Sequence, residues 1–307
     1  IKDFIRAGDT YQVNYTTKYR FCFTGSPYGL YCDLSKKQLT GYSAFMDMDD
    51  MTIISLSPEL FFSKSGDNIV VKPMKGTMKR GRNIPEDKQN MAYLSQDKKN
   101  CSENLMIVDL LRNDLGKIAK TGSVKVQELF GVERYNTLFQ MTSTIKAALL
   151  PDISYYDLFS ALFPSGSVTG APKVRTMQII SELEREPRGI YTGAIGYIEP
   201  GRRAVFNVAI RTIVIKGSRV KGQPFDKLRA KGSRRAEMGV GGGIVWDSDA
   251  ASEYEECKLK GKFLTEPRRD FKLIETMKWD KKKGIELLDL HLERLKSSAE
   301  YFGFRYD

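Results

Sequence analysis

The sequence predicts a fold that combines antiparallel β-hairpins with several long helices, and two patterns carry this prediction. Strand-like runs are joined by short turns rich in Gly, Pro and Asp, as at residues 64–68 and 199–203. Other segments have apolar residues every three or four positions, which is typical of helices. The predicted apolar faces are Leu105, Val108, Leu111 and Leu115 in one helix and Val174, Met177, Ile180 and Leu183 in another. These patterns do not determine the topology.

Composition places the chain among ordinary globular proteins. Of its 307 residues, 41% are hydrophobic and 28% are charged, which is close to the average for such domains. No apolar run approaches the ~20 residues of a membrane-spanning helix, and no signal peptide is visible. The four cysteines are scattered without a C-x-x-C pair, so we expect reduced thiols in a cytoplasmic protein that does not bind membranes.

Positive charge is concentrated in one stretch. The formal net charge is +11, and residues 216–235 contribute +7 of it through eight basic side chains against Asp226. Glycines and a proline interrupt this stretch between two strand-like runs, which predicts a long inserted hairpin loop. The remaining charge favours a small anionic substrate over nucleic acid. The alternative is a non-catalytic basic binding protein derived from a truncated enzyme, which salt-sensitive nucleic-acid binding would reveal.

The segment V-K-P-M-K-G-T-M-K-R at residues 71–80 contains the first candidate catalytic residue. Lys75 lies between a strand-like apolar run and a Gly-Thr turn, where a side chain can project toward a ligand. A lysine amine is nucleophilic only when it is neutral, and burial or nearby positive charge favours that form. Lys72, Lys79 and Arg80 provide such charge. The alternative interpretation is a solvated basic turn.

A carboxylate is predicted to lie beside this lysine. Residues 53–63 and 69–75 read as two strands joined by a polar turn. Folding this hairpin brings Glu59 opposite Met74 or Lys75, depending on the register. A carboxylate beside a reactive amine can act as a general acid/base. An ordinary cross-strand ion pair is the alternative.

Two predicted helices carry further carboxylates. Residues 87–115 are expected to be helical and include Glu103. A second helix places Glu253, Glu256 and Lys260 on one face through three- and four-residue spacings. Carboxylates from two helices suit a hard cation such as Mg²⁺ bound jointly with an anionic substrate. Without that cation, each would be a solvated helix residue.

Three more segments have features of ligand-binding sites. Residues 165–173 lead into a helix, and the free amides at a helix start can bind an anion. The strand predicted at 204–215 places Arg211 opposite its apolar face, where a guanidinium can bind a carboxylate. The glycine cluster at 239–245 lets backbone amides approach a ligand. A capped helix, a surface arginine and a bulged strand are the respective alternatives.

Four motifs together resemble the chorismate-utilising enzymes. P-M-K-G-T at residues 73–77 is similar to the P-I-K-G-T motif of aminodeoxychorismate synthase component I. Related anthranilate and isochorismate synthases typically have alanine where Lys75 stands. Further family signatures are matched in order by G-D-T-Y-Q-V-N at 8–14, S-E-N-L-M-I-V-D-L-L-R-N-D at 102–114 and T-G-A-P-K at 169–173. The resemblance covers residues 1–264 and is highly specific.

The resemblance implies both a fold and a reaction. The fold is the α+β chorismate-binding fold, with two large antiparallel sheets packed face to face and helices outside. The reaction is the transfer of an amino group to C4 of chorismate, giving 4-amino-4-deoxychorismate for para-aminobenzoate and folate biosynthesis. Lys75 would attack the ring, and Glu59 would act as general acid/base. Ammonia would come from a separate glutamine amidotransferase subunit, since the only histidine is His291 and no cysteine–histidine pair exists for that chemistry.

The resemblance also implies the binding residues. Glu103 and Glu256 would be direct ligands of Mg²⁺, and Glu253 would act through water. The implied substrate-binding residues are Gly76, Thr77, Thr169, Gly170, Tyr191, Arg211, Gly241, Gly242, Gly243 and Lys260. The alternative reactions on the same scaffold are anthranilate and isochorismate synthesis, and Lys75 argues against both.

The sequence departs from the family in two places. Relatives usually have an additional N-terminal region before G-D-x-Y-Q-x-N, and we expect that region to be absent here. Gln140 occupies the position where several relatives have a histidine near the substrate. Glutamine cannot exchange a proton at neutral pH, so proton transfer would fall to Glu59, Lys75 or water.

The C-terminal part resembles a different enzyme. Residues 265–270 read as a linker and 271–307 as the truncated start of a lyase-like domain, with a strand-like run at 271–277. The run H-L-E-R-L at 291–295 resembles 4-amino-4-deoxychorismate lyase, a class IV pyridoxal-phosphate enzyme. We expect no function for pyridoxal phosphate here, because the lysine that binds it belongs to the rest of such a domain, and we expect an exposed Leu/Phe surface. The alternative is a C-terminal helix that docks on the main domain.

Overall fold

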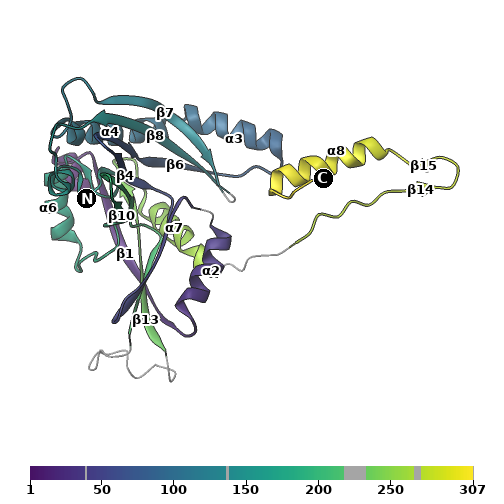
Figure 1. The fold of residues 1–307 in the computed structure, drawn as a ribbon, viewed down its shortest axis with the longest axis horizontal. Helices are drawn as coiled ribbons and strands as arrows, with labels where there is room; N and C mark the ends of the chain where they lie inside the picture. The colour runs from purple at the N-terminus through teal and green to yellow at the C-terminus, as the bar shows by residue number, and fades with distance from the viewer. Residues whose placement is uncertain (39, 136–137, 218–232, 266–270, 307) are drawn as a thin grey trace.

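Two antiparallel sheets organise the computed structural model, which describes residues 1–38, 40–135, 138–217, 233–265 and 271–306 (Figure 1). In these ranges the first sheet has six strands in the order β2-β3-β12-β13-β1-β9. Its strands are Tyr42–Asp47 (β2), Met51–Ser57 (β3), Thr212–Lys216 (β12), Arg234–Ile244 (β13), Gln12–Phe23 (β1) and Gly170–Ala171 (β9). The mixture of helices and antiparallel sheets confirms the predicted α+β class.

The second sheet has seven strands in the described ranges, in the order β10-β11-β4-β5-β8-β6, with β7 also paired to β8. Its strands are Ala194–Glu199 (β10), Arg203–Val208 (β11), Leu60–Ser65 (β4), Asn68–Lys72 (β5), Leu138–Ala148 (β8), Met74–Lys79 (β6) and Lys125–Arg134 (β7). The hairpin predicted at residues 64–68 is confirmed, because Ser65 pairs with Asn68 across a turn that contains Gly66.

Three predicted strands are each broken in two, and this prediction was wrong. The strand predicted at 69–75 is divided at Pro73 into β5 and β6 of the second sheet. Residues 53–63 divide into β3 and β4, and residues 204–215 divide into β11 and β12. Each of these two segments therefore passes from one sheet to the other.

Proline lacks the N–H that a continuous ladder needs, and Pro58 lies at the break in residues 53–63. The breaks in the two segments that change sheets are adjacent, because the Ser57 hydroxyl donates to the Val208 carbonyl at 2.6 Å. Where the two segments change sheets, residues of both sheets lie close together.

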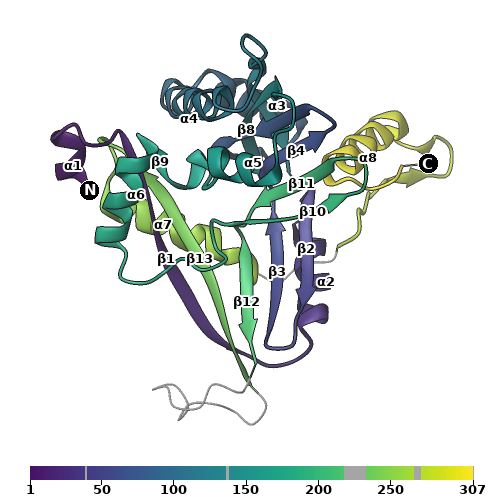
Figure 2. The ribbon, with the colours of Figure 1, turned by 60° about the vertical axis from the view of Figure 1, so that its left-hand side comes forward.

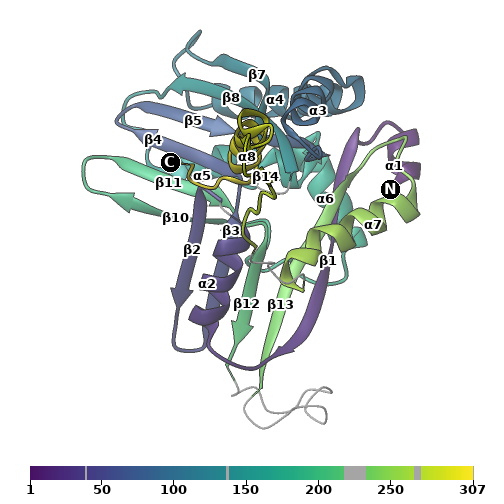
Figure 3. The same ribbon diagram turned by 90° about the vertical axis from the view of Figure 1, so that its right-hand side faces the viewer.

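Most of the helices pack against the two sheets, and the C-terminal helix lies beside them (Figures 2 and 3). The helices are Lys2–Arg6 (α1), Pro27–Lys37 (α2), Ile84–Gln96 (α3), Lys98–Gly116 (α4), Tyr155–Leu162 (α5), Lys173–Leu183 (α6), Ala250–Gly261 (α7) and Leu288–Phe302 (α8). Figure 3 shows α7 lying along β1 and β13. The single helix predicted at 87–115 is divided at Asp97, whose side chain accepts a hydrogen bond from the Asn100 amide as the N-cap of α4.

The core has separate parts for the two sheets. The helices α4 and α5 bury residues such as Ile107 and Leu158 against Phe62 and Ile145 of the second sheet, and α2 buries Leu34 against the first. Two predicted apolar-face residues are instead exposed, namely Leu105 at 44% and Val174 at 68%. Helical spacing locates a stripe only to within about one residue, so its edge can face solvent. On α6 the fully buried apolar residue is Ile179, which the spacing missed.

The C-terminal helix contacts the main domain. The Arg134 guanidinium donates to the Tyr301 carbonyl at 2.8 Å, and the Tyr301 hydroxyl donates to the Gly81 carbonyl at 2.5 Å. The strand predicted at 271–277 does not form, and a short hairpin of Trp279–Asp280 (β14) and Gly284–Ile285 (β15) follows instead. The expected Leu/Phe surface is present, because Leu287, Leu290 and Phe302 are at least half exposed.

Two predicted segments fall outside the described residues: most of the basic loop, at 218–232, and most of the linker, at 266–270. Among the helices that the structure does describe, none has the length and hydrophobicity needed to span a bilayer.

Candidate active site

Lys75 lies on β6 and reaches from the second sheet toward the first. Its Nζ is 3.0 Å from Oε2 of Glu103 on α4. On the other side lies Gly243 of β13, where an added Cβ would be 2.7 Å from the same Nζ. The ammonium group therefore lies between a helix carboxylate and the backbone of the first sheet.

Gln12, at the start of β1, shares this space with Lys75. A Cβ added at Gly243 would also be 2.7 Å from Gln12 Nε2. The Gln12 side chain is fully buried, yet neither its Nε2 nor its Oε1 has a hydrogen-bond partner in the described part of the chain. Buried amides are normally hydrogen-bonded, so this one is available to a ligand. The motif that contains Gln12 is visible in the sequence, but a role for Gln12 is not. Sequence does not show which buried amide lacks a partner.

Glu59 is the buried carboxylate of the site. It is 3% exposed, and its Oε1 has no hydrogen-bond partner among the residues described. Burial raises the pKa of Glu59 to about 7, although the Ser167 hydroxyl, the Met74 amide and the charge of Lys75 all act to lower it. Glu59 therefore lies near Met74 and Lys75, but not as their partner across the predicted hairpin, because that hairpin pairs Leu60 with Lys72, and Met74 and Lys75 lie on β6, which pairs with β8. A carboxyl group with this pKa can donate or accept a proton near pH 7.

Glu256 and Lys260 form an ion pair one turn apart on α7. Lys260 Nζ is 2.7 Å from Glu256 Oε1 and donates to the Gly241 carbonyl at 2.8 Å. Desolvation acts to raise the pKa of Glu256, but the charges of Lys260, Lys75 and Lys99 lower it overall. Lys260 therefore connects α7 to the glycine segment of β13.

Glu253 lies one turn before Glu256 on α7. Its Oε1 accepts a 2.6 Å hydrogen bond from Ser248, and its Oε2 would be 3.1 Å from a Cβ added at Gly242. Adjacent glycines of β13 thus face different groups: Gly242 faces the carboxylate of Glu253, and Gly243 faces the amine of Lys75. The absence of side chains lets both groups approach the strand.

The carboxylates fit Mg²⁺ in their chemistry. Lys75 pairs with Glu103 and lowers the pKa of Glu256, so both carboxylates lie within electrostatic reach of the same amine. Within the described ranges, no group of three or more His, Cys, Asp or Glu side chains is arranged around one point. Mg²⁺ keeps several waters and is held in many enzymes by one or two carboxylates together with the substrate. Glu103 and Glu256 provide carboxylates of the kind that such a site uses.

Gln140 of β8 lies against the Lys75 strand. Its Nε2 donates to the Gly76 carbonyl at 2.8 Å, and its Oε1 accepts from the Thr77 hydroxyl at 3.1 Å. Gly76 has a φ of +97°, which only glycine adopts readily. Gln140 therefore supports the backbone next to Lys75.

The neighbouring basic residues do not serve the role predicted for them. Lys72 is paired with Glu133, and Arg80 is paired with Asp87 in a buried ion pair. These carboxylates neutralise much of the positive charge that the sequence suggested would act on Lys75. Glu133 is far from residues 71–80 in the sequence, and Asp87 lies in the helix that follows them. The pairing therefore depends on the tertiary structure.

The loop before α6 presses against β1. Gly170 pairs with Val13, and a Cβ added at Gly170 would lie 1.9 Å from the Gln12 carbonyl oxygen. Gly170 also has a φ of +149°, so glycine is required for two reasons. The Thr169 hydroxyl donates to the Ser165 carbonyl at 3.0 Å. The structure therefore brings Thr169 and Gly170 next to Gln12.

Tyr191 and Arg211 lie in different surroundings. Tyr191 precedes β10, so the strand predicted to begin there starts later; burial raises the pKa of its hydroxyl, and the charges that act on it include Glu59. Arg211 lies at the break between β11 and β12 with a φ of +48°, and it donates to Gln38 Oε1 at 3.0 Å. Burial lowers the pKa of Arg211, and Tyr135 opposes this shift. The described contacts thus join Tyr191, but not Arg211, to the other site residues.

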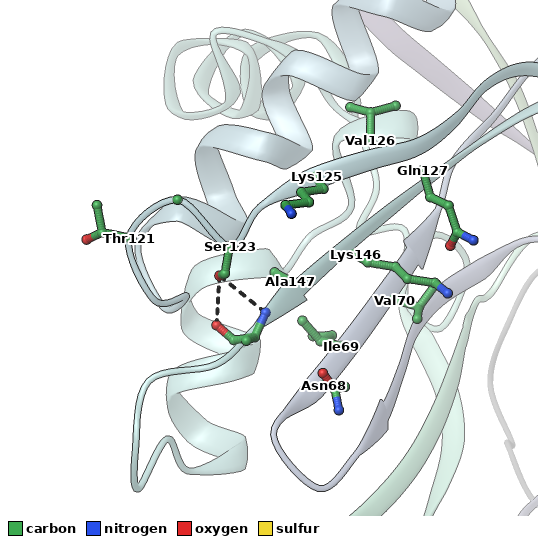
Figure 4. Close-up of a pocket in the computed structure, with 12 residues that line it drawn as sticks. Asn68, Ile69, Val70, Thr121, Ser123, Lys125, Val126, Gln127, Lys146 and Ala147 are labelled. Atoms are coloured by element: carbon green, nitrogen blue, oxygen red, sulfur yellow. Dashed lines mark hydrogen bonds between the residues drawn. The ribbon is translucent and has the colours of Figure 1, made fainter.

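A separate hollow of about 760 Å³ lies on the second sheet (Figure 4). Residues from β5, β7 and β8 line it, together with the turn before β7, where the Ser123 hydroxyl donates to the Ala148 carbonyl at 3.0 Å. None of the predicted site residues lies in its lining. The candidate site is therefore defined by the groups around Lys75 and not by this hollow.

Comparison with known proteins gives a consistent family. Residues 1–266 match the chorismate binding enzymes. The chain is 38% identical over 256 residues to aminodeoxychorismate synthase component 1 of Escherichia coli (strain K12), covering 83% of this chain and 53% of that protein. It is also 38% identical over 263 residues to anthranilate synthase component 1 of Aquifex aeolicus (strain VF5), covering 86% of this chain and 50% of that protein.

A solved structure agrees with the sequence comparison. The crystal structure of anthranilate synthase component I from Streptococcus pneumoniae TIGR4 aligns with a TM-score of 0.75 and 35% identity, covering 86% of this chain and 55% of that one. The chain thus spans about half the length of these relatives. The match extends over most of the chain and includes both sheets, and the chain therefore belongs to the chorismate-binding enzyme family.

Proposed function

We propose that this protein aminates chorismate at C4 to give 4-amino-4-deoxychorismate. The observation that carries the proposal is the position of Lys75, in a P-M-K-G-T motif, beside a buried glutamate, Glu59, whose pKa is about 7. An amine and a proton-transferring carboxyl group side by side are the parts that covalent amination needs.

In the first proposed step, the neutral amine of Lys75 attacks C2 of the ring. The N–C2 bond forms, the ring double bonds shift, and the C4–O bond breaks as the hydroxyl leaves as water. Glu59 donates the proton that makes the hydroxyl a leaving group, and its pKa of about 7 keeps a protonated fraction available near neutrality. The ion pair between Lys75 and Glu103 must open before this attack.

In the second step, ammonia attacks C4. The C4–N bond forms, the double bonds shift back, and the N–C2 bond to Lys75 breaks. Glu59 takes up the proton that ammonia loses, so the sum of both steps is chorismate plus ammonia giving 4-amino-4-deoxychorismate plus water. The unpaired amide of Gln12, next to Lys75, supplies a donor and an acceptor for the ring or for ammonia.

The binding groups follow from the same arrangement. Glu103 and Glu256 would hold Mg²⁺, with Glu253 acting through water, and the cation would neutralise a substrate carboxylate and orient the ring. Lys260 is already close to β13 and would pair with a substrate carboxylate. The remaining proposed contacts are Gly76, Thr77, Thr169, Gly170, Tyr191, Arg211, Gly241, Gly242 and Gly243.

Ammonia is proposed to come from a glutamine amidotransferase partner in the cytoplasm. The chain has one histidine, His291, whose Nδ1 donates a hydrogen bond to the Glu275 carboxylate in the C-terminal part. The hydrogen bonds described for His291 involve no cysteine, which a cysteine-based glutaminase site would need. An assay with ammonium salts tests the chain without the partner.

Product analysis tests the proposal directly. The chain is incubated with chorismate, ammonium and Mg²⁺, and the products are separated by chromatography. We expect 4-amino-4-deoxychorismate, and its formation should require all three components. Absence of this product under conditions in which the chain is folded would contradict the proposal.

Anthranilate synthesis is the second candidate, because the relatives with equal identity include an anthranilate synthase component 1. That reaction aminates the ring at C2 and then releases pyruvate, and it needs no lysine at position 75. The same chromatogram distinguishes the two, since anthranilate is fluorescent and 4-amino-4-deoxychorismate keeps its enolpyruvyl group.

A further inference from the structure

We propose that Arg188 and Glu184 form a positioning pair that sets the spacing between strand β1 and the loop before α6 in the chorismate site. The inference rests on the proposed function, because β1 carries Gln12 and the loop carries Thr169. Neither member of the pair is among the groups that would touch substrate. Its role is to hold two backbone segments that do.

Arg188 uses its whole guanidinium group in this pair. Nε and Nη2 donate to the two carboxylate oxygens of Glu184, both at 2.8 Å. Nη1 donates to the Val168 carbonyl and Nη2 to the Asn14 carbonyl, both at 2.7 Å. The side chain is 15% exposed and that of Glu184 is 7% exposed. A planar fork with donors on several edges can make these four bonds at once, whereas a lysine ammonium cannot.

The two carbonyls belong to the segments that meet at the site. Val168 precedes Thr169, and Asn14 lies two residues after Gln12 on the same strand. The segments also touch directly, because the Asn14 amide donates to the Thr169 carbonyl at 2.7 Å. Arg188 therefore bonds both sides of one junction and fixes the loop of Thr169 against β1.

Glu184 also binds β1, at a position further along the strand. Its Oε1 accepts hydrogen bonds from both the amide and the hydroxyl of Thr16, each at 2.9 Å. The pair thus holds β1 at two positions, Asn14 and Thr16. It also precedes Tyr191 by a few residues, and the charge of Arg188 acts on the Tyr191 hydroxyl. Three segments proposed to contact the substrate are tied to one ion pair.

The pair has a geometric consequence for binding. Gly170 is already in the closest contact that β1 allows, since a Cβ there would overlap the Gln12 carbonyl oxygen. The loop can therefore move only away from β1, and Arg188 opposes that movement. If the bonds to Val168 and Asn14 are lost, Thr169 and Gly170 separate from Gln12 and Lys75, and a rigid ring no longer contacts both sides.

The test uses Arg188→Lys and Glu184→Gln, each of which keeps a polar side chain of similar length. Glu186→Gln is the matched control, because Glu186 is two residues from Glu184 and forms an ion pair with Arg20 in which both side chains are about half exposed. Two quantities are measured for each folded variant: the dissociation constant of chorismate with Mg²⁺, and the hydrogen exchange of the amides in residues 12–16 and 165–171.

We expect both pair variants to exchange faster in these two segments and to bind chorismate at least about tenfold more weakly, with the control unchanged. Unchanged exchange in both segments would overturn the inference whether or not chorismate binds. Faster exchange with chorismate affinity within twofold of the parent chain would also overturn it, because the pair would then be only structural. If the parent chain itself does not bind chorismate, the proposed function fails, and the exchange measurement still decides whether the pair holds the two segments.

Discussion

Lys75 has two kinds of carboxylate neighbour, and they differ in what surrounds them. Glu59 lies at the crossing of the two sheets, where it is 3% exposed and burial raises its pKa to about 7. Glu256 lies on α7, where its side chain is 52% exposed and lysine charges lower its pKa. The same residue type therefore favours its protonated form at one of these positions and its charged form at the other.

The difference shows how the surroundings suit one glutamate to proton transfer and another to binding a cation. A buried carboxyl group without a partner for Oε1 favours its protonated form. A carboxylate between lysines stays charged, which a divalent cation requires of its ligands. Exposure and neighbouring charge, rather than residue type, separate the two roles. Substitutions of Lys75, of these glutamates and of the adjacent glycines test this difference.

The largest effect is expected for Lys75→Ala. Both sides of the comparison act on this amine, so its loss should abolish C4 amination while the fold is retained, because the side chain is at the surface of the site. The control is Lys72→Ala, which removes a neighbouring lysine that is paired with Glu133. The measurement is the rate of 4-amino-4-deoxychorismate formation, and turnover by Lys75→Ala at the parent rate would exclude a covalent role.

Glu59→Gln should remove the acid side of the comparison. We expect the rate to fall by roughly 10²- to 10⁴-fold, the usual contribution of a general acid/base. In the parent chain the rate of the acid-dependent step should decrease as pH rises through about 7, where Glu59 loses its proton. A pH–rate profile in which the variant keeps that descending limb would assign it to another group.

The same variant gives a stability test with a definite sign. The folded-state pKa of Glu59, about 7, is above its ordinary value of 4.5, so the folded chain holds a proton that the unfolded chain releases. The free energy of unfolding should therefore decrease between about pH 4.5 and pH 7, by on the order of 3 kcal/mol. Glu59→Gln should flatten this decrease in denaturant titrations, and an unchanged profile would show that Glu59 is not the group responsible.

Glu103→Gln and Glu256→Gln should each remove one carboxylate of the proposed Mg²⁺ site. We expect each to raise the Mg²⁺ concentration needed for half-maximal activity by roughly 10- to 100-fold. Glu255→Gln is the matched control, since Glu255 lies on the same helix but pairs with Lys258 at 2.7 Å. An unchanged Mg²⁺ requirement in both site variants would remove these residues from the metal site.

The smallest effects should come from adding one methyl group to either of two adjacent glycines. Gly243→Ala would press on Lys75 and Gln12, and Gly242→Ala would press on Glu253. All three are ends of flexible side chains, so the fold should persist. We expect Gly243→Ala to lower the rate with an unchanged Mg²⁺ requirement, and Gly242→Ala to raise that requirement. The reverse assignment would show that the two sides are not separated at this strand.

Much of the local structure was predictable because it depends on short-range patterns. The turn at 64–68 and the two helices that carry Glu103 and Glu256 follow from spacing within one hairpin or helix. Local chemistry and periodicity determine such features with little influence from the rest of the chain. The turn predicted at Gly76 and Thr77 was wrong, because Lys75, Gly76 and Thr77 lie within β6, where the register shifts between Met74 and Thr77.

The features that were missed depend on contacts between distant segments. Nothing near residues 53–63 or 204–215 shows that both strands change sheets at the same point, because each break is stabilised by the other through Ser57 and Val208. The unpaired amide of Gln12, the Ser167 hydroxyl near Glu59 and the neutralised charge of Lys72 are likewise tertiary effects. Sequence identified the residue types, but their partners come from the fold.

One measurement tests the central claim most directly. Chorismate and Mg²⁺ are added to the chain without ammonia. The protein is then digested, and the mass of the peptide that contains Lys75 is measured by mass spectrometry. The account predicts an adduct on Lys75 with the mass of chorismate less one water, which disappears when ammonia is added. An adduct on a different residue, or full amination of chorismate with Lys75 unmodified at every time point, would contradict it.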